Sequence, residues 1–292
     1  MASNNLTYQF KTSSILVKLI VINAIIFLVF SIVPFLMGMQ SDYLLKKWFV
    51  LPETIGEFIL QPWSIITYAF LHSGFWHIFW NMLLLYMLGN FVLNLFNARR
   101  FLTIYLLGAI AGGLLYMLAY NIFPAFAQSR GYLQGASAAV TAIVVFIGTY
   151  TPNAIIRIFI FNVKLWHVAA FFVIADLIRL PASDNAGGLI AHLGGALLGY
   201  VYARQLTKGN DIGRGFERAM DGVANMFKPR KKKPFKKVHR TTQPSGGRSN
   251  QTNSKSDHQK KVDAILDKIG KSGYDSLTKA EKDFLFKAGK DD

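Results

Sequence analysis

The feature that most constrains this chain is a series of six apolar segments separated by polar stretches. A helix needs about 20 mostly apolar residues to cross the hydrocarbon core of a membrane. The segments lie at roughly residues 14–37, 78–96, 102–123, 136–150, 165–180 and 186–203. The fourth and fifth are short, which suits helices that are buried among others and end at a water-filled cavity. The sequence therefore predicts an all-α polytopic membrane protein with six spans.

The charge of the chain is concentrated behind these spans. The chain carries a formal net charge of +16, although 52% of its 292 residues are hydrophobic. From residue 204 onward it holds 22 of the 32 basic residues and 11 of the 16 acidic ones. Clustered positive charge can indicate nucleic-acid binding, but basic residues after a last span usually mark the cytoplasmic side. We therefore expect membrane lipid, and no nucleic acid, as a partner.

Basic residues also predict the orientation of the spans, because short cytoplasmic loops carry an excess of lysine and arginine. Lysines 11 and 18, arginines 99 and 100, Arg157 and Lys164, and the tail cluster fall at alternate ends of the spans. Both termini are then cytoplasmic, and an amphipathic loop at 40–73 lies outside, in the membrane interface. We expect an integral, multi-pass protein of a bacterial inner membrane.

The rest of the chain divides by composition. Residues 1–13 form a cytoplasmic N-terminal segment, 14–205 the six-span domain, and 206–259 a basic linker that is disordered in composition. The basic run in this linker suits contact with anionic lipid, and it equally suits a plain solvated linker. In residues 260–292, apolar residues recur at helical spacing, and Thr278 with Glu281 forms a capping-box pattern. We expect a cytoplasmic C-terminal helical hairpin there.

Three polar clusters lie within the apolar segments, where polar groups are costly and usually functional. His77 and Asn81 are four residues apart, so they share one helical face and could both donate hydrogen bonds to an oxyanion. Ser137 opens the fourth span, where free backbone N–H groups favour negative charge. Each of these residues has an ordinary explanation in helix packing when it is taken alone.

The third cluster lies in the last span. His192, Gly195 and Gly199 form one stripe, which would bring the imidazole close to a neighbouring backbone. Small residues alone can be explained by helix contact, but the imidazole cannot. Together the clusters supply a nucleophile, a base and oxyanion donors, as acyl transfer requires. We expect no acidic residue beside them, and we expect Asp176 to pair with Arg179 on its own helix.

These motifs resemble the rhomboid family of intramembrane serine proteases. The motifs are the H-x-x-x-N of His77 and Asn81, the G-x-S of Gly135 and Ser137, and the A-H-x-x-G-x-x-x-G that contains His192, Gly195 and Gly199. The resemblance covers all six spans in order and leaves the tail outside.

The resemblance implies a six-transmembrane-helix bundle with a Ser–His dyad. Ser137 would be the nucleophile and His192 the general base and acid, while His77 and Asn81 would hold the oxyanion. His72 matches a histidine that supports the site. The substrates would be transmembrane segments of other membrane proteins, which would enter beside the fifth span at about 165–180. No cofactor and no metal are implied, and the oligomeric state is left open.

Two departures from the family pattern concern the site. The residue after the serine is often glycine in the family but is Ala138 here, which we expect to crowd the contact with the His192 helix. Four residues after the serine, where the family often has a tyrosine that stacks on the histidine, this chain has Thr141. The resemblance therefore leaves open what orients His192.

Three other functions fit the sequence less well. A catalytically inactive relative that binds membrane clients would be marked by loss of the serine or the histidine, and both are present. A metalloprotease that uses His72, His77 and His192 lacks H-E-x-x-H and has the wrong spacing. A transporter would be expected to show an internal repeat of spans, which the sequence does not show. The absence of cysteine excludes thiolate catalysis.

Overall fold

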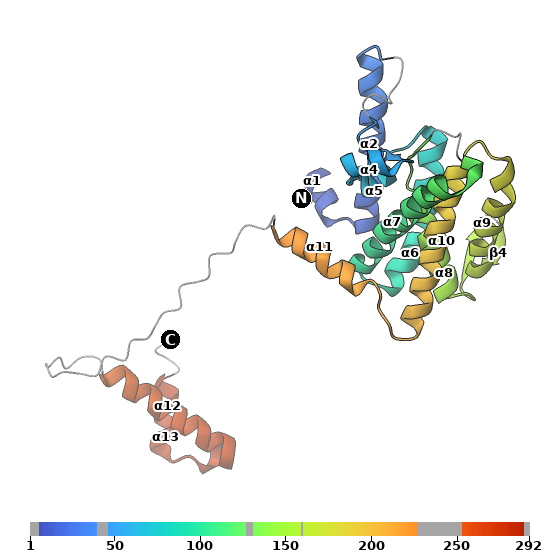
Figure 1. Ribbon diagram of the computed structural model, residues 1–292. Helices are drawn as coiled ribbons and strands as arrows, with labels where there is room; N and C mark the ends of the chain where they lie inside the picture. The colour runs from blue at the N-terminus through green and yellow to red at the C-terminus, as the bar shows by residue number, and fades with distance from the viewer. Residues whose placement is uncertain (1–5, 40–45, 127–130, 159, 227–252, 289–292) are drawn as a thin grey trace. The chain divides into compact units, whose positions relative to one another are not determined.

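The computed structural model describes residues 6–39, 46–126, 131–158, 160–226 and 253–288 (Figure 1). Residues 1–5, residues 40–45 of the predicted external loop, residues 227–252 of the predicted basic linker and residues 289–292 lie outside this description. The chain divides into two units, Met1–Pro229 and Arg230–Asp292, and each is described by itself.

The first unit is a bundle of apolar helices, as the sequence predicts. Five helices are long and apolar enough to cross a membrane. This number includes the helix Leu165–Arg179, which reaches the required length together with the 3-10 turn that follows it. The sixth, α8, has 14 residues and is shorter than that length. The helices are α2 (Ile15–Leu36), α6 (Phe75–Leu95), α7 (Ala98–Ile122), α8 (Ser137–Tyr150), α9 (Leu165–Arg179) and α10 (Ala186–Thr207). The all-α polytopic class is thereby confirmed.

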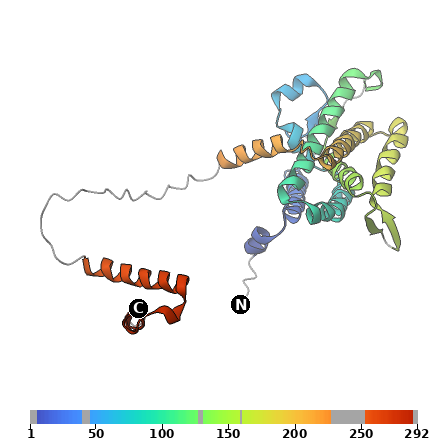
Figure 2. The ribbon, with the colours of Figure 1, turned by 90° about the horizontal axis from the view of Figure 1, so that it is seen from below.

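The short helix α8 forms the centre of the bundle. It packs against α7 and α10, and on its other sides against α6 and α9 (Figure 2). Every residue from Ala138 to Gly148 is buried. A helix that is surrounded in this way need not match the thickness of the membrane, because other helices rather than lipid cover its sides.

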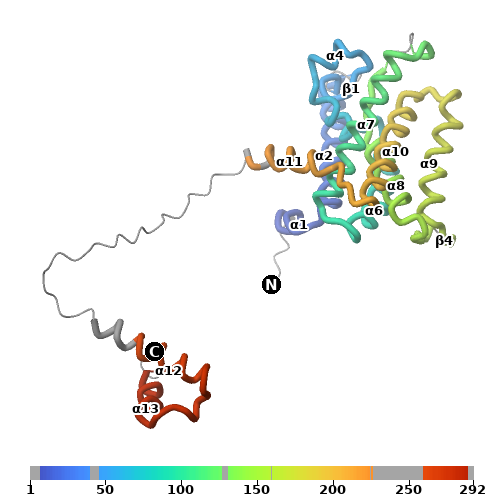
Figure 3. The backbone as a smooth tube through the Cα atoms, turned by 60° about the horizontal axis from the view of Figure 1, so that its bottom comes forward, coloured from blue at the N-terminus to red at the C-terminus, as the bar shows by residue number. Residues whose placement is uncertain are grey.

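Two helices lie at opposite edges of the bundle. Figure 3 shows α2 at one edge and α9 at the other. Large apolar side chains on both helices are exposed, among them Leu28, Phe35, Phe171 and Ile178. In a helix that faces lipid, apolar residues on the outer surface are the stable arrangement.

Short elements connect the helices. Before α2 lies α1 (Leu6–Thr12), and between α2 and α6 lie β1 (Leu51–Pro52), α4 (Ile55–Leu60), α5 (Ser64–Thr67) and the 3-10 turn η1 (Tyr68–Phe70). The turn η2 (Pro124–Phe126) and β2 (Tyr132–Leu133) follow α7, the hairpin of β3 (Ile155–Ile158) and β4 (Phe161–Lys164) follows α8, and η3 (Leu180–Ala182) follows α9. Strands β1 and β2 pair antiparallel, with Leu51 opposite Leu133. This pairing ties the long loop after α2 to the segment that leads into α8.

The chain after α10 forms α11 (Arg214–Met226), which contacts α7. Asp221 of α11 lies 3.0 Å from Arg99, and Asp211 in the preceding turn accepts hydrogen bonds from Arg100 and Tyr202. Burial opposes ionisation of Asp211, but the Arg100 and Tyr202 hydrogen bonds outweigh it, so that the pKa of this carboxyl lies below its ordinary value. Basic side chains at the end of the bundle thereby fix the start of the tail.

The second unit contains α12 (Asn253–Ser272), the turn η4 (Tyr274–Ser276) and α13 (Lys279–Ala288). Lys268 of α12 contacts Glu281 of α13 at 2.9 Å. The capping box is confirmed, because the Thr278 N–H donates to Glu281 Oε2 at 2.7 Å and the Glu281 N–H donates to Thr278 Oγ1 at 3.3 Å. The hydrogen bonds from Thr278 and the Lys268 contact lower the pKa of Glu281 to about 2. The cytoplasmic location of these helices stays a prediction.

Candidate active site

One cavity of about 910 Å³ brings together the polar side chains of the three sequence motifs. His77 and Asn81 line it from α6, Ser137 and Thr141 from α8, and His192 from α10. Each of these helices contributes residues from near its N-terminal end. The three motifs, which are far apart in the sequence, therefore meet in one place.

The loop before α8 is shaped around Gly135. This residue has φ of +131°, which L side chains rarely adopt. A Cβ atom at this position would lie 2.7 Å from the His77 ring and 3.5 Å from Ser137 Oγ. Only glycine fits such a position, so the G-x-S pattern has a steric cause. The same distances place both the His77 ring and the Ser137 hydroxyl next to Gly135.

The side chain of His72 contacts this loop from the protein interior. The side chain is buried, and its Nε2 accepts the N–H of Ala136 at 3.5 Å. Lys46 donates to the His72 carbonyl at 3.1 Å. Burial, assisted by the neighbouring His77, lowers the pKa of His72 to about 3. The imidazole is thus neutral near neutral pH, which keeps Nε2 available as an acceptor immediately before Ser137.

The surroundings of His77 define its tautomer. The backbone N–H of Ser73 donates to His77 Nδ1 at 3.4 Å, and Ser73 Oγ lies 2.9 Å from the same atom. Because Nδ1 accepts, the ring proton lies on Nε2, the nitrogen near Gly135. Asn81 donates one amide hydrogen to the His77 carbonyl at 2.8 Å and keeps a second one. Both side chains therefore carry a donor that can serve a group bound beside Ser137.

His192 contacts Asp176, the carboxylate that we expected to pair with Arg179. Its Nδ1 lies 2.9 Å from Asp176 Oδ2 on α9, so the expectation of no acidic residue near the site is wrong. The expected pairing of Asp176 with Arg179 is also wrong, although Arg179 lines the same cavity. A usable signal was present, because Asp176 and His192 each lie eight positions from Asp184 in the loop that joins α9 and α10. Antiparallel helices place such residues at equal depth.

The hydroxyl of Ser137 has space around it. Among the described residues no hydrogen bond joins Ser137 Oγ to His192, and such contacts are often loose before a substrate binds. No side chain caps the start of α8 at Ala136. The first backbone N–H groups of α8, which have no helical carbonyl partner, are therefore available beside the hydroxyl.

Glycines hold α10 and α7 close to α8. A Cβ atom on Gly195 would lie 2.0 Å from the Ala138 carbonyl oxygen, and one on Gly199 would lie 2.3 Å from that of Ala142. The prediction that the methyl group of Ala138 crowds α10 is wrong. This methyl group faces α7, where a Cβ atom on Gly112 would lie 2.5 Å from it. The extra carbon after the serine is accommodated because α7 has glycine opposite.

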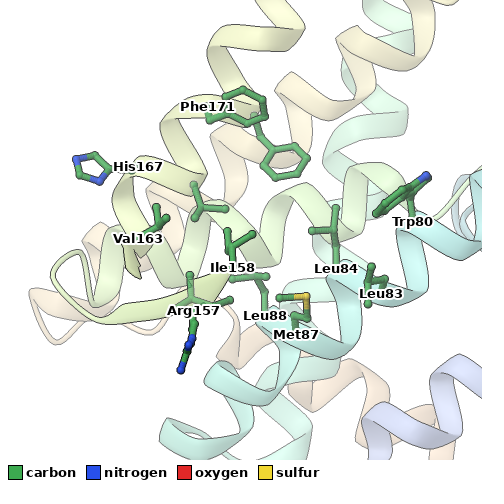
Figure 4. Close-up of a pocket in the computed structure, with 13 residues that line it drawn as sticks. Trp80, Leu83, Leu84, Met87, Leu88, Arg157, Ile158, Val163, His167 and Phe171 are labelled. Atoms are coloured by element: carbon green, nitrogen blue, oxygen red, sulfur yellow. The ribbon is translucent and has the colours of Figure 1, made fainter. Parts of the chain in front are cut away.

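An apolar groove of about 790 Å³ lies beside the cavity, between α6 and α9 (Figure 4). Its α6 side includes Leu84 and Met87, and its other side is formed by Val163 of β4 and Phe171 of α9. In Figure 4 the Arg157 and His167 side chains point away from the apolar side chains between them. Trp80, Leu84, Phe171 and Phe172 line both the groove and the cavity, so the two spaces adjoin.

The described residues hold no group of three or more His, Cys, Asp or Glu side chains that could bind a metal ion. The three histidines of the metalloprotease alternative are accordingly not arranged as ligands. Two of them already use a ring nitrogen in the contacts to Ala136 and Ser73.

Comparison with known proteins gives matches to two families and to two curated relatives. Residues 60–209 match the rhomboid domain family, and residues 250–287 match a family of unknown function (DUF6576). The chain is 30% identical over 172 residues to rhomboid protein 1, mitochondrial, of Saccharomyces cerevisiae, covering 56% of this chain and 46% of that protein. It is 29% identical over 157 residues to RHOMBOID-like protein 12, mitochondrial, of Arabidopsis thaliana, covering 50% of this chain and 47% of that protein. The chain thus spans about half the length of these relatives.

Proposed function

Because the chain belongs to the rhomboid family, we propose that it is an intramembrane serine endopeptidase that cleaves transmembrane segments of other membrane proteins. Ser137 is the nucleophile and His192 the general base and acid. One observation carries the proposal: Ser137, His192 and two hydrogen-bond donors line a single cavity in a bundle of apolar helices. Such a constellation has the parts that acyl transfer requires.

The reaction follows from these positions. Ser137 Oγ attacks the carbonyl carbon of the substrate as its proton moves to His192 Nε2. The tetrahedral oxyanion accepts hydrogen bonds from His77 Nε2–H, the free Asn81 amide hydrogen and the backbone N–H of Ser137. His192 then gives its proton to the leaving amine. A water molecule, deprotonated by His192, attacks the acyl group, and His192 returns this proton to Ser137 Oγ as the acid product leaves. The polar lining of the cavity suits the entry of that water.

The groove between α6 and α9 is the proposed entrance for the substrate. A transmembrane segment that arrives through the lipid meets apolar side chains there, and its polar backbone stays covered until it reaches the cavity. Because Trp80, Leu84 and Phe171 border both spaces, an unwound end of the substrate can pass from one to the other.

The alternative proposal is a catalytically inactive protein that binds membrane clients in the same groove. The open contact between Ser137 and His192 is the observation that favours it. Retention of both side chains, and of a carboxylate on His192, favours the protease.

The chain is an integral, multi-pass membrane protein, as its helices and its family show. We propose that both termini lie on the cytoplasmic side, on the basis of the positive charges described above. The bacterial inner membrane expected from the sequence has no support from the two relatives, which are both named mitochondrial. Binding of the basic linker to anionic lipid also stays a proposal.

The test is covalent labelling with a fluorophosphonate probe in liposomes. We expect the native chain to be labelled, and Ser137→Ala and His192→Ala each to lose at least about 99% of that labelling because they remove the nucleophile and its base. Loss of the His77 or Asn81 side chain should cost less, on the order of 3 kcal/mol at most for one oxyanion donor. Leu197→Ala on the exposed face of α10 is the control and should be labelled like the native chain.

Two outcomes would contradict the proposal. Full labelling of Ser137→Ala would show that another residue reacts. No labelling of a folded native chain, with a labelled family member alongside, would favour the inactive client-binding protein. Melting temperatures of all variants in detergent exclude unfolding as the cause of a loss.

A further inference from the structure

Asp176 is a carboxylate in a place where carboxylates are costly. It lies near the end of α9 and is 5% exposed, within a helix whose other residues are mostly apolar. An ionisable residue inside a membrane helix normally faces a partner or a water-filled cavity and has a function. Asp176 has both, because its Oδ2 atom lies 2.9 Å from His192 Nδ1 and its side chain lines the cavity of Ser137.

The contact with Asp176 determines which nitrogen of His192 carries the proton. An ionised carboxylate only accepts hydrogen bonds, so the neutral imidazole must hold its hydrogen on Nδ1. Nε2 then has a free lone pair, and this is the atom that can take a proton from a hydroxyl. Without the carboxylate, either nitrogen could carry the hydrogen, and the ring could rotate within the cavity.

The other charged groups at the cavity do not provide this contact. Arg179 lies one helical turn from Asp176 and lines the cavity, but a guanidinium only donates and cannot accept the Nδ1 hydrogen. His77 faces the cavity from α6, with Nδ1 engaged by Ser73. Asp176 is thus the acceptor that the described residues offer to His192.

We propose that Asp176 is the positioning residue of the active site, which fixes His192 in the Nδ1-protonated tautomer and completes a Ser137–His192–Asp176 arrangement across α8, α10 and α9. The catalytic part of this inference rests on the proposed function. The positional part does not, because the tautomer of His192 can be measured in a chain that cleaves nothing.

A purely structural role must be distinguished from this one. The same contact ties α9 to α10, so its loss lowers stability under either interpretation. A tether does not select a ring tautomer, and it does not change the covalent step more than the binding step. The test therefore needs readouts that stability alone does not move.

The experiment compares the native chain with Asp176→Asn and Asp176→Glu. Saturation labelling with a fluorophosphonate separates the binding constant of the probe from the rate constant of the covalent step. We expect Asp176→Asn to lower that rate constant by roughly 100-fold or more, since the corresponding change in soluble triad enzymes costs about 10⁴-fold. The binding constant should change by less than about threefold, and Asp176→Glu should recover most of the rate.

The matched control is Asp184→Asn, the same chemical change in the exposed loop between α9 and α10. It should be labelled at the native rate. Nitrogen-15 NMR of histidine-labelled protein in detergent, with the His192→Ala spectrum used for assignment, reports the tautomer directly. The native chain should show His192 protonated on Nδ1, and Asp176→Asn should lose that signature.

Each outcome decides one of the two proposals. A native chain without Nδ1 protonation, or an Asp176→Asn variant with an unchanged covalent rate constant, overturns the role of Asp176. A native chain that is never labelled overturns the proposed protease, while the NMR result still decides whether Asp176 positions His192. Slower labelling of Asp176→Asn together with a lost signature supports both.

Discussion

The two sides of the cavity that contains Ser137 and His192 are built differently. Where α8 meets α7 and α10, glycines lie against backbone carbonyls and small side chains, and the residues in this seam are buried. Where α6 faces α9, large side chains such as Trp80 and Phe171 border a groove and remain exposed. A site built in this way can be both fixed and accessible. Close backbone contact holds Ser137 and His192 in place, while bulky, loosely packed residues leave an entrance on the other side.

Asp176 links the two sides. It belongs to α9, the helix at the edge of the bundle, but it contacts His192 of the closely packed seam. A displacement of α9 away from α10 would therefore also remove the carboxylate from the imidazole.

The largest expected effect comes from the seam itself. Gly195→Ala places a methyl group 2.0 Å from the Ala138 carbonyl oxygen, so α8 and α10 must separate. We expect a loss of stability of about 3 kcal/mol or more, at the upper end of the usual cost of overpacking. The measurement is thermal unfolding in detergent, with Leu197→Ala on the same helix as the control. An unchanged melting temperature would show that the seam is not rigid.

A smaller effect should come from the other flank of the seam. Gly112→Ala brings two methyl groups together with Ala138, and we expect it to cost about 1–3 kcal/mol. Ala138→Gly in the same chain should restore part of this stability, because it removes one of the two methyl groups. Restoration stays partial, since the Ala191 carbonyl also lies 2.7 Å from the new Cβ atom. Additive losses in the double variant would contradict the proposed contact.

The smallest effect on stability should come from the groove. Because the chain has no cysteine, Phe171→Cys gives a single attachment point for a bulky maleimide. We expect the melting temperature to change little, since Phe171 is 68% exposed. Cleavage of a transmembrane test peptide should fall at least about tenfold. Fluorophosphonate labelling of Ser137 should fall less, because Phe171 borders the cavity as well as the groove but a small probe does not have to pass through the groove. Equal losses of both activities would show that the groove is not a separate entrance.

Much of this arrangement could be predicted from the sequence because its signals are local. Apolar length defines the spans, and helical spacing places His77 with Asn81 and His192 with Gly195 on single faces. The order of the motifs indicated the family, which the match at residues 60–209 confirmed. Thr278 and Glu281 gave a capping box for the same reason, since both partners lie within one helical turn.

Which residues meet between helices depends on how the helices pack. The rotation of α9 and α10 about their axes determines that Asp176 faces His192 rather than Arg179, and no local pattern encodes that rotation. The approach of α7 likewise determines that the Ala138 methyl group faces Gly112 and leaves α10 free. The spans and the candidate site residues could be predicted from the amino-acid sequence alone. Packing decided how His192 is held, because that contact depends on the relative placement of two helix surfaces.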